Sequence, residues 1–300
     1  MNRADARIDP LLGLEPWSAR VRVGSVTLGG GAPLVLVAGP CVIEGESVVL
    51  RIADKLSALT SRLKIPLIFK ASFDKANRTS ASSFRGLGQE EGLRILERVG
   101  RDFGLPLTTD VHEVGQVAAV AEVVDLMQIP ALLCRQLDLL RACSRSGRPV
   151  NIKKGPFMAP AQMKEVRTNA IAFGCEALVL TERGTCFGYH DLIVDFRAMA
   201  DLGRLGSPLL FDVTHALQRP GALGSSSAGE PRWIPPLLRA AVALGVDGLF
   251  MEVHDRPDKA LSDAAIMPAL DDLEPLLEQA LALDETRRLL GERLSGRITA

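Results

Sequence analysis

Cationic side chains crowd the stretch FKASFDKANRTS, residues 69–80, which begins like a buried strand. They are Lys70, Lys75 and Arg78, with amide and hydroxyl side chains between them. An arginine offers a planar fork that suits phosphate or carboxylate, whereas a lysine acts as a mobile point charge. Because such cations would repel one another in an empty site of low effective dielectric, their clustering predicts a multiply charged anionic ligand.

Other polar residues stand at the ends of short apolar segments along the chain. Each segment reads as a strand and is followed by a longer stretch with helical spacing of apolar residues. The strands are expected at Leu34–Gly39, Pro66–Ala71, Pro106–Val111, Asp125–Ile129, Val150–Lys154, Ala177–Glu182, Leu209–Thr214 and Gly248–Val253. The polar residues at or just after their ends are Cys41, Lys70, Asp110, His112, Gln128, Lys153, Arg183, His215, Glu252 and His254.

This repeated strand–helix order predicts an α/β fold, a (β/α)8 TIM barrel. A doubly wound sheet is the alternative, but no G-x-G-x-x-G pattern follows the first strand. We expect one domain over residues 1–300, with an N-terminal arm and β-hairpin cap in 1–32, the barrel in 33–283 and a C-terminal helical extension in 284–300. Because binding sites of barrels lie at the carboxyl ends of the strands, the polar residues should converge in one pocket.

Strand alternation indicates which of two adjacent lysines faces the barrel axis. If Ile152 packs outward against the helices, then Asn151 and Lys153 point inward. Lys154 is then expected at the surface or in the layer behind the pocket.

Composition limits the partners and the compartment. The chain has 35 basic and 36 acidic residues, a net charge of -1, so no overall field attracts nucleic acid or an anionic membrane. Its five cysteines are odd in number and form no C-x-x-C pair, which favours reduced thiols and a cytoplasmic location. No apolar run approaches the roughly 20 residues that cross a bilayer. The N-terminus lacks the apolar stretch of a secretory signal.

The chain closely resembles the 3-deoxy-D-manno-octulosonate 8-phosphate synthases over about residues 33 to 283. The resemblance rests on AGPCVIE, FKASFDKANRTS, TDVHE, QIPALLCRQLDLL, NIKKGPF, ERGTCFGYHDLIVDFR, FDVTHALQ and FMEVHDRPDKALSD. It implies a homotetrameric (β/α)8 transferase of lipopolysaccharide sugar biosynthesis. Such an enzyme condenses phosphoenolpyruvate with D-arabinose 5-phosphate and water, and releases inorganic phosphate.

The resemblance also assigns site residues. Phosphoenolpyruvate contacts are expected from Lys70, Lys75, Gln128, Lys153 and Arg183. Arabinose 5-phosphate contacts are expected from Asn77, Arg78 and Thr79, and Arg135 is expected to reach the sugar phosphate of a neighbouring subunit. Asp110 and His112 belong to the pocket floor, and the candidate catalytic residues are Lys75, Asp110 and His215.

The same family contains metal-dependent enzymes and metal-free ones that carry asparagine where this chain has Cys41. With Cys41 present, the resemblance implies a divalent-metal site of Cys41, His215, Glu252 and Asp263. Taken alone, Cys41 would be read as a small buried apolar residue. A mixed sulfur, nitrogen and oxygen set accepts zinc, iron, manganese, cobalt or cadmium. His254 is expected beside the ligands.

Two other functions are open to this sequence. The 3-deoxy-arabino-heptulosonate 7-phosphate synthases share the barrel, the metal and phosphoenolpyruvate, but use erythrose 4-phosphate and typically have K-P-R-T-S where this chain reads KANRTS. A non-catalytic phosphosugar-binding barrel is the second alternative. Residues 217–232, rich in small and polar side chains, are expected to form a lid over the pocket.

Overall fold

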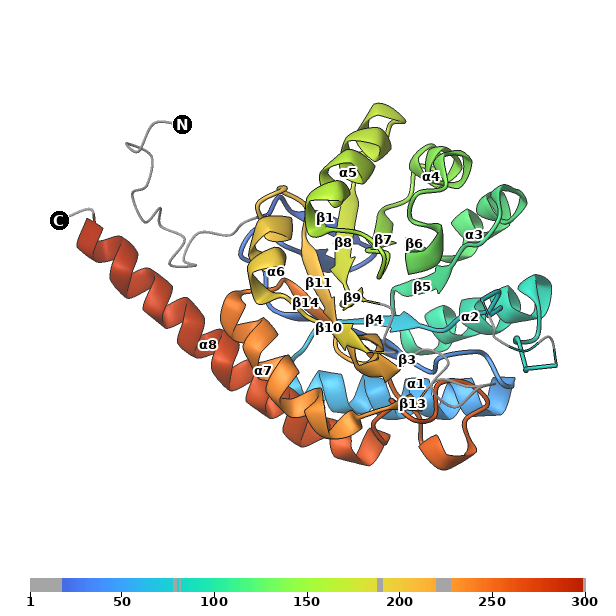
Figure 1. Ribbon diagram of the computed structural model, residues 1–300. Coiled ribbons are helices and arrows are strands. Elements are labelled where there is room, and N and C mark those ends of the chain that lie inside the picture. Colours follow the sequence, from blue (N-terminus) through green and yellow to red (C-terminus); the bar gives the residue numbers. More distant parts are fainter. Residues whose placement is uncertain (1–17, 78–79, 81, 188–190, 220–227, 299–300) are drawn as a thin grey trace.

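Parallel strands close into a barrel in the computed structural model, which describes residues 18–77, 80, 82–187, 191–219 and 228–298 (Figure 1). Around the barrel the strands follow the order β11-β14-β3-β4-β5-β6-β7-β8, and β8 pairs with β11 to complete the ring. Their bounds are β3 Val35–Gly39, β4 Leu67–Lys70, β5 Leu107–Asp110, β6 Leu126–Ile129, β7 Val150–Lys153, β8 Leu178–Glu182, β11 Leu209–Asp212 and β14 Gly248–Glu252.

Helices surround this ring and connect one barrel strand to the next (Figure 1). α2 and α7 end on the glycines Gly104 and Gly245 in left-handed conformation, which carry little steric cost there. The helices are α1 Glu46–Leu63, α2 Gln89–Phe103, α3 Val117–Val123, α4 Leu137–Ser144, α5 Met163–Ala172, α6 Phe196–Gly203, α7 Ile234–Leu244 and α8 Leu273–Ile298. Short 3-10 helices lie at 114–116, 131–133, 160–162, 215–217, 231–233, 257–259 and 270–272.

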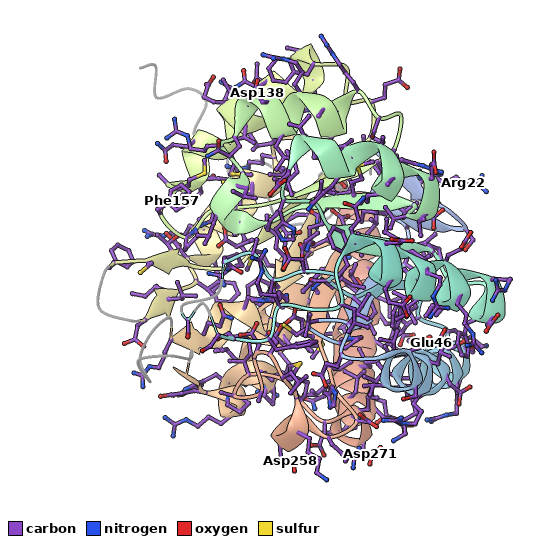
Figure 2. All side chains as sticks on the ribbon, turned by 90° about the vertical axis from the view of Figure 1, so that its right-hand side faces the viewer. Arg22, Glu46, Asp138, Phe157, Asp258 and Asp271 are labelled. Atoms are coloured by element: carbon purple, nitrogen blue, oxygen red, sulfur yellow. The ribbon has the colours of Figure 1, made fainter. Side chains whose placement is uncertain are left out.

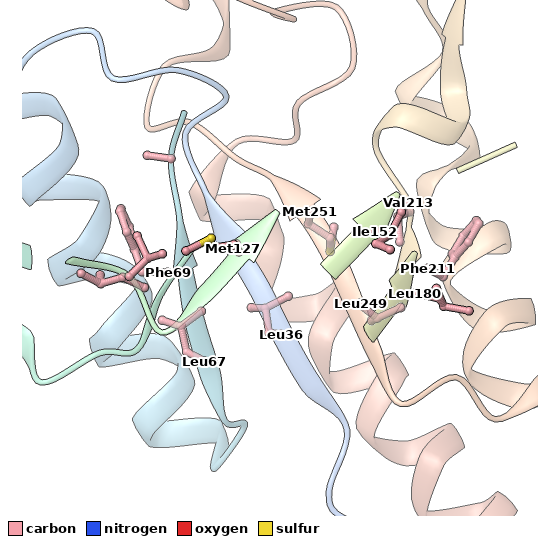
Figure 3. Close-up of a cluster of buried hydrophobic side chains, with 14 of the residues drawn as sticks. Leu36, Leu67, Phe69, Met127, Ile152, Leu180, Phe211, Val213, Leu249 and Met251 are labelled. Carbon is pink, nitrogen blue, oxygen red and sulfur yellow. The ribbon is translucent and has the colours of Figure 1, made fainter. Parts of the chain in front are cut away.

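The layer between strands and helices is apolar, because every barrel strand sends alternate side chains outward. Figure 3 shows outward residues of several strands, among them Leu36, Phe69 and Phe211. All three are buried in one large cluster that also includes the inner faces of the helices. This packing fixes the strands and therefore the positions of the residues at their carboxyl ends.

A short antiparallel hairpin, β1 Val21–Val23 and β2 Val26–Leu28, contributes to a second apolar cluster, which also contains inward-facing strand residues. Its two-residue turn begins at Gly24, whose φ of 53° is readily adopted by glycine. We call this cluster the floor cluster; it comprises Val21, Val23, Val26, Leu28, Val35, Val37, Ile68, Leu126, Val179, Leu210 and Phe250.

The predicted barrel, N-terminal hairpin and C-terminal helix are confirmed, and the closed ring excludes the doubly wound sheet. The predicted boundary at Asp284 falls inside α8. This helix is both the last helix of the barrel and the predicted C-terminal extension, and it extends past α7 (Figure 1). Residues 1–17 of the predicted arm lie outside the described residues. In the part of the chain that the structure describes, no helix is both long and apolar enough to cross a membrane.

Two further small hairpins lie in loops at the carboxyl end of the barrel, and neither was predicted. One pairs β9 Thr185–Cys186 with β10 Leu192–Ile193, and the other pairs β12 Gln218–Arg219 with β13 Ala228–Gly229. The second lies in the segment predicted to form a lid, of which residues 220–227 are outside the described residues.

Candidate active site

A cavity of about 840 Å³ lies at the carboxyl ends of the barrel strands. Polar residues from separate strands converge there, in contrast to the charged residues Glu46, Asp138 and Asp271, which Figure 2 shows at the outside of the molecule. The predicted site residues that line the cavity are Lys70, Lys75, Asn77, Asp110, His112, Lys153, Arg183, His215, Glu252 and Asp263. The predicted shared pocket is therefore present.

Lys70 is the most deeply buried of the described cations that line this cavity, with only 1% of its side chain exposed. Its ammonium donates to Glu252 Oε1 at 2.9 Å and to Ser72 Oγ at 2.8 Å, and lies 3.6 Å from Asp110 Oδ2. The backbone of β3 passes so close that a Cβ on Gly39 would lie 2.0 Å from the Lys70 carbonyl oxygen. Only glycine allows this approach, which sets the height of Lys70 in the barrel.

Lys75 approaches the same carboxylate from the loop after β4. Its ammonium lies 3.2 Å from Glu252 Oε1. Burial alone would lower the pKa of Lys75, but charge interactions with the acidic groups around it, Cys41 and Glu252 first, raise it well above its usual value. Burial would likewise raise the pKa of Glu252, but His215, Lys70 and Lys75 bring it well below the usual range. Both groups are therefore charged near neutral pH.

The cationic cluster is interleaved with carboxylates, which differs from the self-repelling cluster expected from the sequence. Burial alone would raise the pKa of Asp110, but Lys70 and Lys75 lower it well below its ordinary value. Asp110 accepts hydrogen bonds from Ser72 Oγ at 2.5 Å and Gln128 Nε2 at 2.7 Å. Lysines and acids thus compensate one another before any ligand binds.

A line of buried amides and hydroxyls supports Asp110 from the neighbouring strands. Asn151 Nδ2 donates to Gln128 Oε1 at 2.8 Å, and Thr181 Oγ1 donates to Asn151 Oδ1 at 2.7 Å. Because each amide has a donor on one side and an acceptor on the other, both orientations are fixed. Gln128 is therefore engaged beneath the cavity and is not among its lining residues.

Lys153 and His215 share one carboxylate, that of Asp212 at the end of β11. Lys153 Nζ lies 2.5 Å from Asp212 Oδ2, and His215 Nδ1 lies 2.8 Å from the same oxygen. The Lys153 ammonium also stands 3.6 Å from the centre of the Phe250 ring. Burial lowers the pKa of Lys153, and Asp212 opposes that effect. His215 Nε2 is thereby directed toward Glu252 and Asp263, at 3.5 and 3.8 Å.

Lys154 is fully buried, so the expectation of a surface position is wrong, whereas a position behind the pocket is what the structure shows. Its ammonium donates to Gly184 O at 3.0 Å and Thr185 Oγ1 at 3.1 Å, and lies 3.4 Å from Glu182 Oε1. Glu182 in turn accepts from the backbone N–H of Arg183 at 3.0 Å. Lys154 and Glu182 point away from the barrel axis and interact with each other. They thus connect the ends of β7 and β8, where Lys153 and Arg183 point into the cavity.

Cys41, Glu252 and Asp263 form a cluster whose ligand atoms lie within 4.8 Å of one another. Cys41 Sγ lies 3.2 Å from Asp263 Oδ2, and burial raises the pKa of the thiol well above its usual value. Glu252 Oε2 is buried and has no hydrogen-bond partner among the described residues. A sulfur, two carboxylates and the nearby His215 Nε2 make a donor set that suits a divalent transition metal, so the predicted ligands fit such an ion.

Asp263 has an unusual backbone, with a φ of 51°. Aspartate tolerates this left-handed conformation better than most residues, because its short side chain can form local hydrogen bonds. The conformation belongs to the loop after β14, which brings Asp263 back over the strand ends.

Four predicted residues in the described part of the chain are not among those that line the cavity: Cys41, Gln128, Arg135 and His254. Arg135 is exposed and lies outside the lining, and His254 is buried behind it, where Nδ1 accepts from the Arg256 N–H at 2.9 Å. Arg78 and Thr79 lie outside the described residues.

Sequence reasoning missed several groups that complete the site. Asp212 follows the same rule of polar strand ends as the predicted residues and could have been found by it. Ser72 shares strand parity with Lys70 and could also have been found. Gln218, Ser262 and Cys186 reach the cavity from loops, where no periodicity places a side chain.

Comparisons with known proteins identify the family of this chain. Residues 15–288 match the model of the DAHP synthetase I family. The chain is 53% identical over 267 residues to 2-dehydro-3-deoxyphosphooctonate aldolase of Synechococcus sp., covering 89% of this chain and 94% of the relative. It is 52% identical over 264 residues to the protein of the same name from Geobacter metallireducens, covering 88% and 97%. The chain therefore belongs to the DAHP synthetase I family.

Proposed function

We propose that this protein is a 2-dehydro-3-deoxyphosphooctonate aldolase, another name for 3-deoxy-D-manno-octulosonate 8-phosphate synthase. It condenses phosphoenolpyruvate with D-arabinose 5-phosphate. The identity of 53% to a relative of that name supports the activity. The observation that carries the chemistry is the meeting of Lys70, Lys153 and Arg183 in one cavity beside the Cys41–Glu252–Asp263 cluster.

The cavity suits two anionic substrates. Its volume of about 840 Å³ lies within the range of small-molecule sites and has room for two compact phosphorylated metabolites. Lys70, Lys75, Lys153 and Arg183 hold the phosphate and carboxylate of phosphoenolpyruvate, and Gln128 acts from beneath by orienting Asp110. Asn77, with Arg78 and Thr79 beside it in sequence, binds the sugar phosphate, and Arg135 reaches the sugar phosphate of a neighbouring subunit.

The reaction forms a bond between C3 of phosphoenolpyruvate and the aldehyde carbon of the sugar. Water adds its oxygen to C2, the C2–O bond to phosphate breaks, and inorganic phosphate leaves with the electron pair of that bond. The aldehyde oxygen gains one proton. The attacking water loses both of its protons, one as it adds to C2 and the other as its oxygen becomes the ketone oxygen of the product, and the second proton leaves with the phosphate. Lys75, Asp110 and His215 are the residues placed to hold or move these protons, and the fixed cations stabilise the charge that develops.

Cys41, His215, Glu252 and Asp263 would hold a divalent metal: zinc, iron, manganese, cobalt or cadmium. Such an ion supplies a Lewis acid beside the substrates. The protein contributes the orientation of His215, whose Nδ1 faces Asp212 and whose Nε2 faces the cluster. Asp212 thus orients the imidazole through its charge.

Release of inorganic phosphate tests the substrate assignment. The purified protein is incubated with phosphoenolpyruvate and either arabinose 5-phosphate or erythrose 4-phosphate. We expect release with arabinose 5-phosphate. Release with erythrose 4-phosphate alone would instead support a 3-deoxy-arabino-heptulosonate 7-phosphate (DAHP) synthase, the enzyme after which the matching family is named. Binding without any release would support the non-catalytic barrel.

Metal dependence is tested with chelator-treated protein and two cysteine variants. Cys41→Ala removes the proposed sulfur ligand, whereas Cys143→Ala removes an equally buried thiol on α4, away from the cavity. We expect chelation and Cys41→Ala to abolish phosphate release, divalent metal to restore the chelated protein only, and Cys143→Ala to retain activity. Full activity in verified apoprotein would contradict the metal.

We place the enzyme in the cytoplasm as a homotetramer. None of the five cysteines, all of which the structure describes, is in a disulfide, which supports a reducing compartment. Analytical ultracentrifugation tests the tetramer, and a monomeric active enzyme would overturn it together with the role of Arg135.

A further inference from the structure

Gln218 lies between the two halves of the site, at the start of the β12–β13 hairpin and three residues after His215. Its side chain lines the cavity. Gln218 Oε1 accepts a hydrogen bond from Arg183 Nη2 at 2.7 Å. Gln218 Nε2 donates to Asp263 Oδ1 at 3.1 Å. One amide therefore connects a proposed anion-binding cation to a proposed metal ligand.

The orientation of this amide is determined by its partners. Arg183 has only donors, so it must face the carbonyl oxygen of Gln218. Asp263 as a carboxylate has only acceptors, so it must face the NH2 group. A flipped amide would lose both hydrogen bonds and place like groups against each other. The amide of Gln218 therefore matches both partners at once, with its oxygen toward Arg183 and its nitrogen toward Asp263.

The two oxygens of Asp263 have different surroundings. Oδ1 accepts from Gln218, while Oδ2 lies 3.2 Å from Cys41 Sγ and 3.8 Å from His215 Nε2. A change in the position of this carboxylate is transmitted directly to the Gln218 amide. Because Arg183 is 7% exposed and bound to the same amide, it must follow or lose that contact.

The backbone around Gln218 is held against the loop that carries Asp263. Gln218 pairs with Gly229 across the hairpin. A Cβ on Gly229 would lie 2.0 Å from Ile266 Cγ2, so only glycine permits this approach. The Ile266 N–H donates to the Asp263 carbonyl oxygen at 3.1 Å, which ties the contact to Asp263 itself. The hairpin base and the Asp263 loop thus pack as one unit.

We propose that Gln218 is a positioning residue that couples the metal site to the phosphoenolpyruvate site. When Asp263 is fixed by a bound metal, the amide holds Arg183 in the orientation that binds the anion; when Arg183 is fixed by the anion, the amide holds Asp263 for the metal. This inference rests on the proposed function, since it assumes that both ligands bind. By linkage, each ligand must then raise the affinity for the other by the same factor.

Two equilibrium titrations measure this factor without turnover. Phosphoenolpyruvate, in the absence of sugar phosphate, is titrated by calorimetry into chelator-treated protein and into protein loaded with Co²⁺. Co²⁺ is then titrated with and without phosphoenolpyruvate, and its absorbance reports on the Cys41 thiolate. The variants are Gln218→Leu and Gln218→Met, the second being close in length should the first fail to fold. Gln279→Leu on α8, far from the cavity, is the matched control.

In the wild-type protein and in Gln279→Leu, we expect each ligand to raise the affinity for the other by an equal factor, on the order of 5- to 100-fold. In the Gln218 variants both ligands should still bind, with that factor reduced by roughly three-fold or more. An unchanged factor in the Gln218 variants, or a factor of one in the wild type while both ligands bind, would overturn the coupling and leave the proposed function intact. If neither ligand binds wild-type protein, the proposed function fails and the coupling fails with it.

Discussion

The two ends of the barrel are built from the same strands but contain opposite chemistry. Toward the amino end, inward side chains such as Val35, Ile68 and Leu210 pack on the hairpin in the floor cluster. Two residues further along the same strands, the inward positions hold Lys70 and Asp212, which belong to the charged cluster at the cavity. We call that charged end the rim.

Phe250 lies at the boundary between these regions. It belongs to the floor cluster, yet its ring faces the ammonium groups of Lys153 at 3.6 Å and Lys70 at 5.6 Å. An aromatic face attracts cations. The Phe250 ring can therefore pack on the apolar floor cluster on one side and interact favourably with the two lysines on the other. The floor thus provides stability by burial, while the rim keeps ionised groups out of water for binding.

The largest effect is expected from Lys70→Met at the rim. This change leaves Glu252 and Asp110 without their shared cation, so unfolding free energy should fall by about 3–5 kcal/mol. Loss of a fixed charge at the reacting centre should lower kcat/KM by about 10² to 10³ or more. Denaturant unfolding and the phosphate-release assay measure the two effects.

Lys55→Met is the matched control for Lys70→Met. Lys55 forms an exposed ion pair with Asp271 at 3.2 Å, so its loss should change stability by about 1 kcal/mol or less and leave kcat/KM unchanged. Equal effects of the two lysine variants would remove the distinction between rim and surface charges.

A floor variant, Leu28→Ala, should affect stability alone. Leu28 is fully buried in the hairpin, and its truncation should cost about 2–5 kcal/mol of unfolding free energy. Because Phe250 and the strand interior separate it from the cavity, kcat/KM per folded molecule should not change. Activity measured in the temperature range where the variant stays folded checks this, and a loss of kcat/KM there would show that floor and rim are coupled.

A smaller effect, one of pH, is expected at Asp247 near the floor. Its Oδ2 accepts from the Leu209 N–H at 2.8 Å, and burial raises the carboxyl pKa above 3.8. The folded state therefore binds the proton more tightly than the unfolded state, so the contribution of Asp247 to stability falls as pH rises from 3.8 through the raised pKa. Asp247→Asn lacks this titration and keeps an acceptor.

Denaturant unfolding of wild type and Asp247→Asn at several pH values tests this sign. The stability of the variant relative to wild type should increase with pH across that window and then stay constant. A relative stability that decreases with pH would mean that the folded state favours the ionised carboxylate.

The barrel and most of the rim were predictable because strand periodicity and polar strand ends are local signals. Lys70, Asp110, Lys153 and Glu252 fall where alternation places them. The sequence could not decide whether Lys154 lies at the surface or behind the site. Its burial depends on Glu182 and on two loops, and these come together only in the folded protein. Gln218 gave no signal, because an amide in a loop acquires its role only from neighbours distant in sequence.

Lys153→Met tests most directly whether rim cations serve the anionic substrate. Asp212 Oδ1 keeps hydrogen bonds from Thr214 Oγ1 at 3.1 Å and the His215 N–H at 2.9 Å, but Oδ2 loses its buried cation, so the unliganded variant should be less stable by about 3 kcal/mol. Each protein is therefore compared with its own unliganded stability. The measurement is the gain in unfolding free energy on adding phosphoenolpyruvate at 100 times the wild-type Kd. We predict about 2.7 kcal/mol for wild type and less than half of that for Lys153→Met. An equal gain in both proteins would contradict the account.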